Sequence, residues 1–475
     1  MASNPHRWRI LAVVATAFFM TILDVSIVNV ALPSIAEDLN FSQENLQWVI
    51  TAYAIAFGGF LLLGGRAADL IGRRVVFMVG VALFTAASLV CGLAQNEGML
   101  IASRAVQGLG GAIISPAALS IVMTSFEEGR ERNKALGVWG ALGGSGAAVG
   151  VLLGGILTDY LSWRWIFFVN VPVGIAVLLM TTRIVPESKR DDEGRSYDAL
   201  GAVLVSAGLA LLVYAISEAP QVGWATARTI LLLIAAGALL VGFLVNELRR
   251  RDPLMPFDIF RVRTVAGANA VGALLGAVIF ANFFLLTLYV QDILGFSPVK
   301  TGLTFLATAG TAVLSAGVAQ ALTTRFGAKP IIVIGLALLT GAMVWYSQIP
   351  VHGSYVSDLL PGYLMVGVGI AFSFVPVSIA ALAGVAEREA GLASGLINTS
   401  QQIGGAIGTA VASTVFTTHF KSLAKAGRSV PDALTHGYGY AFWALAFFGL
   451  AAIVAAIVLI RRDEMAESPV TAPIA

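Results

Sequence analysis

Two charged residues lie well inside apolar stretches of this chain, where ionised side chains are rarely found. Asp24 follows the apolar run 10–20, and Arg104 lies within the stretch 98–125. A carboxylate at mid-bilayer depth costs roughly 2.5–3.5 kcal/mol on insertion scales, and such residues usually serve a function. Because an aspartate in an apolar surrounding near an arginine can exchange a proton, this pair is the first candidate for chemistry.

Two other interpretations of Asp24 remain open. Asp24 and Arg104 could form a static ion pair that only holds two helices together. Asp24 could also lie in a water-filled vestibule rather than inside the membrane. The residue types alone do not decide between these interpretations and proton exchange.

The composition is that of an integral membrane protein. The chain has 475 residues, of which 57% are hydrophobic and only 12% are charged, and a soluble domain needs far more polar surface. The net charge of +2 gives no indication of nucleic-acid binding. The single cysteine, Cys91, cannot form a disulfide within the chain. The N-terminal apolar run continues beyond the length of a signal peptide and is followed by many similar runs.

Apolar runs between charged and turn-forming segments predict fourteen membrane-spanning helices, since about 20 helical residues cross a bilayer. The expected spans are 10–32, 46–65, 75–94, 98–125, 135–158, 165–183, 199–217, 229–246, 264–290, 301–321, 330–349, 359–383, 395–417 and 438–460.

Lysines and arginines are distributed unequally between alternate connecting segments. If the N-terminus is inside, the inner segments hold 22 of the 29 lysines and arginines, the outer segments hold 6, and Arg104 is the remaining one. Because positively charged residues favour the cytoplasmic side, we expect both termini in the cytoplasm. The alternation also favours fourteen spans, since a missed span would invert every later assignment.

An internal repeat divides the chain into two halves. Residues 130–150 and 388–408 both fit R-E-x5-G-x8-G-x3-G, at an offset of 258 residues. Glycine-rich membrane helices produce G-x3-G by chance, but five matched positions before the fifth and thirteenth spans favour duplication. We therefore expect six-helix halves at 10–183 and 264–460, a linker at 184–263 with two inserted spans (199–217 and 229–246), and a cytoplasmic tail at 461–475.

Several motifs together resemble the major facilitator superfamily, and within it the fourteen-span drug:proton antiporters. They are "LDVSIVNVALP" in span one, "GRAADLIGRR" at 65–74, "RAVQGLGGA" at 104–112, the glycine series of span five, "WRWIFFVNVPVG" at 163–174 and "YVQDILGFSPVKTGL" at 289–303. The resemblance extends from Ile10 to about Arg462. It implies an all-α membrane fold, with two six-helix halves and two additional central spans.

The resemblance also implies roles for two groups of residues. A cytoplasmic latch between the halves would comprise Gly65, Asp69, Gly72 and Arg73, with glycines 65 and 72 allowing a tight turn. The antiporter motif of span five would comprise Gly137, Gly146, Gly150, Gly154 and Gly155. The proline that normally follows the third of these glycines is replaced by Val151, which weakens any local kink. We expect the glycine face to pack tightly, at the interface between the halves.

In this superfamily the first and fourth helices of each half line a central cavity, which would place Asp24 and Arg104 in it. The hypothesis is that Asp24 alternates between a proton and a cationic substrate, and that Arg104 modulates the exchange or relays the proton. Pro33 would end the first helix. Candidates for contact with substrate are Asn29, Gln107, Asn282, Phe283, Asn398 and Gln402.

The expected function is proton-coupled export of hydrophobic or cationic compounds across the bacterial inner membrane. We expect no enzymatic activity, no cofactor other than the proton gradient, no metal and no nucleic-acid partner. The expected partners are amphipathic or cationic organic substrates, protons and membrane lipid. The chain is expected to be a monomer. No nucleotide-binding G-x4-G-K-[ST] loop is present, which excludes an ATP-driven pump in this chain. One alternative is export of an endogenous metabolite, siderophore or lipid; a remote one is a non-transporting receptor or scaffold.

Overall fold

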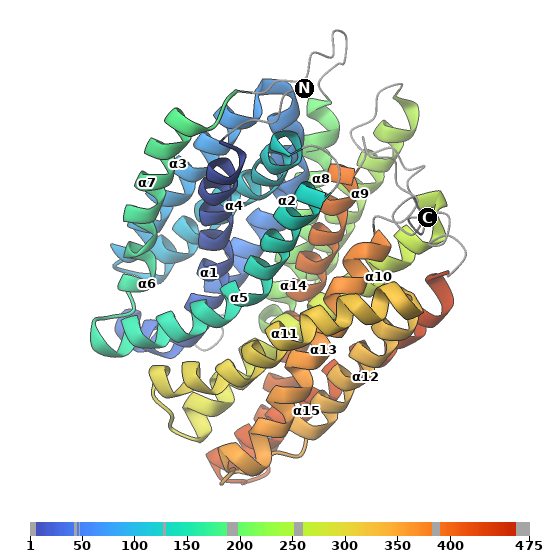
Figure 1. Ribbon diagram of the computed structural model, residues 1–475. Coiled ribbons are helices and arrows are strands. Elements are labelled where there is room, and N and C mark those ends of the chain that lie inside the picture. The colour runs from blue at the N-terminus through green and yellow to red at the C-terminus, as the bar shows by residue number, and fades with distance from the viewer. Residues whose placement is uncertain are drawn as a thin grey trace. The chain divides into compact units, whose positions relative to one another are not determined.

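The computed structural model describes residues 6–41, 45–46, 48–126, 130–187, 198–250, 260–381 and 390–461. All regular structure within these ranges is helical (Figure 1). The helices are α1 (Arg7–Leu39), α2 (Trp48–Ile71), α3 (Arg73–Gly92), α4 (Glu97–Ser125), α5 (Arg130–Tyr160), α6 (Trp165–Phe168), α7 (Asn170–Ile184), α8 (Ala199–Val222), α9 (Ala227–Arg249), α10 (Arg263–Leu288), α11 (Pro298–Phe326), α12 (Ala328–Tyr346), α13 (Leu360–Ala381), α14 (Ala390–Lys425) and α15 (Val430–Leu459), with π-helical turns η2 (Tyr289–Ile293) and η3 (Tyr355–Leu359).

Ten of the helices in the described ranges are long and apolar enough to cross a membrane. Three shorter apolar stretches lie in α2, α5 and α8. Each of the fourteen expected spans falls on a helix, but α14 carries the polar run 398–402 in its first half. The count of fourteen spans therefore stays a prediction.

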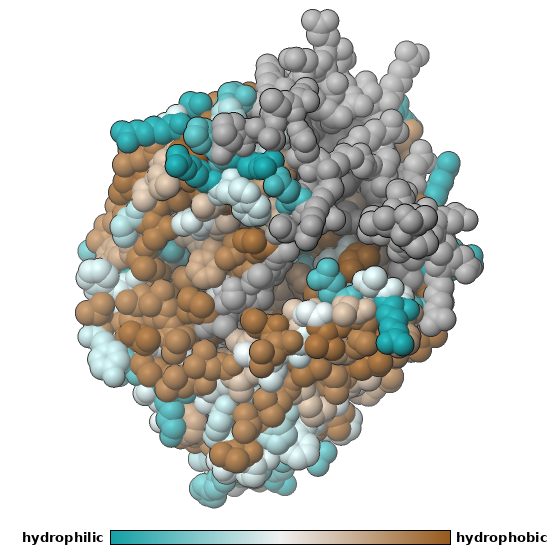
Figure 2. Space-filling view, in the orientation of Figure 1, coloured by the Kyte–Doolittle hydropathy of each residue, from teal (hydrophilic) through white to brown (hydrophobic). Residues whose placement is uncertain are grey.

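Large apolar side chains are exposed along many of these helices. Examples are Leu179 on α7, Leu231 on α9 and Leu314 on α11, and apolar residues cover much of the visible surface in Figure 2. Apolar surface of this extent is unusual for a soluble monomer but suits contact with lipid. The chain is a multi-pass membrane protein.

The chain divides into two compact units. The first comprises residues 1–210 and 236–254, and the second comprises residues 211–235 and 255–475. The helices α8 and α9 are thus each divided between the units. The expected linker at 184–263 and the tail at 461–475 stay predictions, since residues 188–197, 251–259 and 462–475 lie outside the described part of the chain.

The first helix is longer than the sequence indicates. Pro33 was expected to end it, but α1 continues through Pro33 to Leu39. Proline removes one backbone donor from a helix, and the turns on either side are long enough to keep the helix in place. The helix ends where Asn40 adopts a left-handed conformation (φ 55°, ψ 42°) and its N–H bonds to the carbonyl of Ala36.

Three glycines of α5 pack against α1 in the same unit, and the expected position of this face at the interface between the halves stays a prediction. A β-carbon at Gly150 would lie 2.9 Å from the carbonyl oxygen of Leu23, and one at Gly154 would lie 2.7 Å from that of Ile27. The glycine spacing identifies a smooth face, but it does not identify the helix that packs on it. Gly146 packs against the side chain of Ile22 on α1, where an added β-carbon would lie 2.7 Å from a methyl carbon.

The repeated motif makes an equivalent contact in the second unit. Gly404 and Gly408 on α14 correspond to Gly146 and Gly150 by the repeat. They pack against α10, where added β-carbons would lie 1.8 Å from the carbonyl oxygen of Ala273 and 2.3 Å from that of Ala277. Each unit therefore holds its fifth helix against its first by direct contact with backbone. Such close approach is typical of small residues in membrane helices.

This packing predicts different outcomes for two glycine-to-alanine substitutions. Gly404→Ala should destabilise the protein by about 1–3 kcal/mol, because the added carbon must displace the α10 backbone. Gly310 on α11 is the matched control, since an added β-carbon there meets no atom within 4 Å; Gly310→Ala should be neutral or slightly stabilising. Thermal unfolding of the purified variants measures both. Equal unfolding temperatures for the two variants would contradict the close contact.

Candidate functional site

Asp24 is fully buried in the first unit and accepts hydrogen bonds from three side chains. Arg104 Nη1 donates to Oδ2 at 2.5 Å, Gln107 Nε2 donates to Oδ1 at 2.7 Å, and Asn170 Nδ2 donates to Oδ1 at 3.1 Å. These residues come from α1, α4 and α7. A buried carboxylate is stable only with such partners, because burying a charge without them is very costly.

Arg104 is also almost completely buried, with 1% of its surface exposed. Its Nε donates to the carbonyl of Val49 at 3.0 Å, and its Nη1 donates to Gln107 Oε1 at 2.8 Å. The guanidinium carbon lies 4.4 Å from the centre of the Tyr53 ring on α2. A cation at this distance over an aromatic face is stabilised further.

Ser88 on α3 links the amides around Asp24. Its hydroxyl accepts from Gln107 Nε2 and from Asn170 Nδ2, both at 3.1 Å, and donates to the carbonyl of Phe167 on α6 at 2.9 Å. The charge pair and its amide and hydroxyl partners thus form one buried network that joins α1, α2, α3, α4, α6 and α7. We call Asp24, Ser88, Arg104, Gln107 and Asn170 the Asp24 network.

The Asp24 network is formally neutral and has almost no contact with solvent, since its five side chains are between 0% and 2% exposed. In this conformation neither water nor a substrate reaches the carboxylate. Protonation of Asp24 would remove the charge attraction in its bond to Arg104, which is the strongest in the network. The arrangement can therefore couple the protonation of one carboxyl group to the packing of six helices.

The other candidates for substrate contact do not join this network. Asn29 donates to the carbonyl of Val25 on its own helix. In the second unit, Asn282 and Phe283 lie on α10, and Asn398 and Gln402 lie on α14. Asn282 is buried, and its Oδ1 accepts no hydrogen bond from the described residues. Gln107 was predicted to contact substrate, but in this structure its side-chain amide is hydrogen-bonded to Asp24, Arg104 and Ser88.

Comparison with known proteins now identifies the family. The model of the Major Facilitator Superfamily matches residues 14–409. The chain belongs to this superfamily. It is a transporter and not an enzyme.

This transporter is similar to two bacterial proteins along nearly its whole length. The puromycin resistance protein pur8 of Streptomyces alboniger is 41% identical, with 98% of this chain and 93% of the relative covered. The cephamycin export protein CmcT of Amycolatopsis lactamdurans is 38% identical, with 94% and 92% covered. The crystal structure of the human organic anion transporter MFSD10 (TETRAN) superposes with a TM-score of 0.67 at 16% identity, covering 95% of this chain and 100% of that one, which shows a shared fold.

Three members of the Asp24 network were not predicted as partners of Asp24. Asn170 lies in the motif at 163–174 and Ser88 in span three, but neither received a role, and Gln107 was predicted to face the substrate. The available signal was that each is a polar residue inside an apolar helix, where an unsatisfied polar group is costly. They lie up to 146 residues from Asp24 in the sequence, so their contact with it could not be predicted without the fold.

The predicted latch residues of this transporter lie around the start of α3. Gly65 and Asp69 are in α2, so the turn is made by Gly72 alone, whose φ of 130° favours glycine. The Glu187 carboxylate accepts from the backbone N–H groups of Arg74 and Val75, at 3.1 and 3.2 Å. Arg73 is the first residue of α3. This contact lies within one unit, and a role as a latch between halves stays a prediction.

The charge pair predicts a specific pattern of stabilities. Arg104→Gln leaves the Asp24 carboxylate buried without a counter-charge, and should destabilise the protein by about 3–5 kcal/mol. The double variant Asp24→Asn/Arg104→Gln removes both charges and should recover much of that loss. Thermal unfolding of the purified variants measures this coupling.

The control for this pattern is Arg164→Gln. Arg164 pairs with Asp38, but the two side chains are 32% and 48% exposed, and exposed pairs contribute at most about 1 kcal/mol. Equal losses of stability in Arg104→Gln and Arg164→Gln would contradict the buried network.

Proposed function

We propose that this transporter exports hydrophobic or cationic organic compounds from the bacterial cytoplasm in exchange for protons. Two relatives are named for puromycin resistance and cephamycin export, and a third, from Streptomyces glaucescens, for tetracenomycin C resistance and export. The observation that carries proton coupling is the fully buried Asp24, held by three side-chain donors. A carboxyl group in such a place is a natural proton carrier.

The proposed mechanism uses the difference between the two charge states of Asp24. When the carboxylate is ionised, Arg104, Gln107 and Asn170 hold α1 to α4 and α7. A proton on Asp24 cancels its attraction to Arg104 and occupies one acceptor oxygen. The network then loses its strongest bond, and α1 can move relative to α4. This movement would open the carboxyl group to one side of the membrane and later to the other.

The static-pair interpretation predicts a different behaviour. A pair that only holds helices together would stay closed during transport, and its replacement by neutral residues would leave coupling intact. The Asp24 network instead lies on α1, α3, α4 and α7 and bonds to carbonyls of α2 and α6, so its opening would affect most of the first unit at once. This extent favours a role in coupling.

Polar and aromatic groups of the second unit suit an amphipathic substrate. The Phe283 and Phe305 rings lie 5.2 Å apart. Asn282 precedes Phe283 in the sequence, and its buried Oδ1 has no hydrogen-bond donor among the described residues. Apolar walls with a few polar groups bind lipophilic molecules. We propose that Asn282 and Phe283 contact the substrate when the transporter opens.

A second candidate function is export of a compound made by the cell itself. It is favoured by the names of three relatives, each of which refers to one antibiotic, whereas Stp of Mycobacterium tuberculosis, 34% identical, is named for multidrug resistance. Both candidates use the same mechanism and differ in substrate range. Export of many unrelated dyes and drugs supports multidrug efflux, and export of one compound class supports the alternative.

The proposal predicts that Asp24→Asn abolishes proton-driven export. Cells that express the protein should extrude ethidium, and an uncoupler that collapses the proton gradient should stop this efflux. Asp24→Asn should reduce efflux to the level of cells without the protein, because an amide cannot carry the proton. The amount of protein in the membrane is measured in parallel.

Asp38→Asn is the matched control, since it makes the same change near the end of the same helix. Asp38 is partly exposed and pairs with Arg164, so this variant should retain efflux. Full, uncoupler-sensitive efflux by Asp24→Asn would exclude the coupling role. Uncoupler-insensitive efflux by the unmodified protein would exclude proton antiport.

We further propose fourteen spans with both termini in the cytoplasm. Cys91 is fully buried, so introduced cysteines can be labelled selectively. Ala225→Cys, between α8 and α9, should react with a membrane-impermeant maleimide in intact cells. Thr324→Cys, near the end of α11, should react only after permeabilisation. The opposite pattern at either position would refute the topology.

A further inference from the structure

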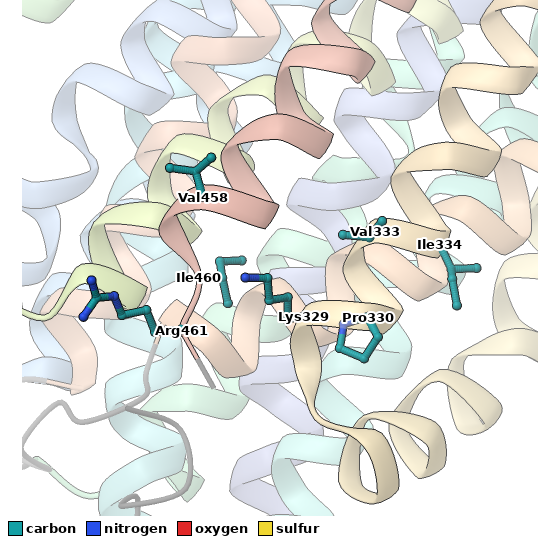
Figure 3. Close-up of a pocket in the computed structure, with 7 residues that line it drawn as sticks. All are labelled: Lys329, Pro330, Val333, Ile334, Val458, Ile460 and Arg461. Atoms are coloured by element: carbon teal, nitrogen blue, oxygen red, sulfur yellow. The ribbon is translucent and has the colours of Figure 1, made fainter. Parts of the chain in front are cut away.

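An open groove lies in the second unit, where the start of α12 meets the end of α15 (Figure 3). Its volume is about 790 Å³. Two cationic residues, Lys329 and Arg461, and four apolar residues, Val333, Ile334, Val458 and Ile460, contribute to its lining. The groove is distant in sequence from the Asp24 network and belongs to the other unit.

Lys329 is held at the groove by the end of α15. Its ammonium donates to the carbonyl oxygen of Ile457 at 2.6 Å, and Figure 3 shows its side chain pointing from α12 toward α15. This carbonyl is one of the last four of α15, which have no partner within the helix. The contact uses one of three N–H donors of the ammonium, so the charge remains available to an anion.

Arg461 is placed by its backbone rather than by its side chain. Its N–H donates to Thr264 Oγ1 at 3.1 Å, and the Thr264 hydroxyl lies 3.4 Å from its carbonyl oxygen. Arg461 as a whole is exposed. Among the described residues, neither Arg461 nor Lys329 forms an ion pair with a carboxylate. Residues 462–475 lie outside the described part of the chain.

The apolar wall of the groove continues onto the outer surface of the helices. Ile334 is 48% exposed and Val458 is 59% exposed. Ile334 lies on α12 beyond Lys329, and Val458 lies on α15 before Arg461. By the orientation proposed above, Lys329 and Arg461 lie at the cytoplasmic ends of α12 and α15. The groove thus has positive charge at the level of the inner lipid headgroups and apolar surface at the level of the acyl chains.

We propose that this groove binds an anionic phospholipid of the inner leaflet, with its phosphate between Lys329 and Arg461 and one acyl chain along Val333, Ile334 and Val458. Basic pockets between membrane helices on the cytoplasmic side suit such headgroups. The two cations repel the cationic compounds proposed as substrates. A free phosphate ion would use the charges but not the apolar wall. A bound lipid would hold the start of α12 to the end of α15.

Native mass spectrometry of the full-length protein in mild detergent tests the proposal independently of transport. Phosphatidylglycerol and phosphatidylcholine of equal chain length are offered together, and the bound amounts are compared. The unmodified protein should prefer phosphatidylglycerol. Lys329→Gln/Arg461→Gln should lower this preference about tenfold or more, because each cation near an anionic lipid surface contributes roughly a fivefold effect.

Three further variants separate lipid binding from folding and from general charge. Arg461→Gln alone keeps the contact of Lys329 with α15 and should lower the preference by a smaller factor. Arg9→Gln/Arg183→Gln removes two exposed positive charges from the first unit and should leave the preference unchanged. Lys329→Arg/Arg461→Lys keeps both charges and should also leave it unchanged.

Three outcomes would overturn the proposal. The first is an unmodified protein that binds the two lipids equally. The second is a double variant that keeps its preference for phosphatidylglycerol. The third is inorganic phosphate that displaces the lipid at concentrations similar to those of the lipid itself, which would assign the site to a soluble anion. None of these outcomes depends on whether the transporter is proton-coupled.

Discussion

The charge pair of Asp24 and Arg104 is the constraint on which the first unit depends. Two ionised groups with almost no exposure persist in an apolar interior only if every strong donor and acceptor is matched. Gln107, Asn170 and the carbonyl of Val49 bond directly to the two charged groups, and Ser88 accepts hydrogen bonds from both amides. These four partners lie on four different helices. The positions of α1, α2, α3, α4 and α7 are therefore fixed by the need to keep one carboxylate and one guanidinium satisfied.

The two units share a packing plan but not this polar network. In both, glycines on the fifth helix contact the backbone of the first, α5 on α1 and α14 on α10. Close to the level where Asp24 lies on α1, the described part of α10 presents the buried apolar residues Leu275, Ala277 and Val278. Duplication explains the shared contact, because direct packing of backbone on backbone tolerates little change in sequence. Among the described residues, a fully buried ion pair is present in the first unit and not in the second.

The sequence was sufficient to predict the helices and the two central charges, but not most of their partners. Asp24 and Arg104 were identifiable because charges are rare inside apolar helices, and that signal requires no knowledge of the fold. Asn170 carries no such signal, since an amide is common enough in membrane helices, and its contact with Asp24 depends on how α7 packs. Pro33 and the α5 glycines likewise show that contacts set by the tertiary fold could not be predicted from the sequence. Their local effects are predictable, whereas the continuation of α1 and the choice of its neighbour are set by tertiary contacts.

A buried ion pair suits a moving part better than an apolar contact of the same size. Replacing such a pair by well-packed hydrophobic residues is often neutral or stabilising, which means that its net contribution to stability is small. Its contribution changes greatly, however, when one proton is added, because the attraction is lost while the burial remains. The stability that an apolar contact contributes does not change in this way with proton concentration, because it has no group that binds a proton. The Asp24 network therefore combines a modest net stability with a large response to one proton, which is the property that the proposed coupling to a proton gradient requires.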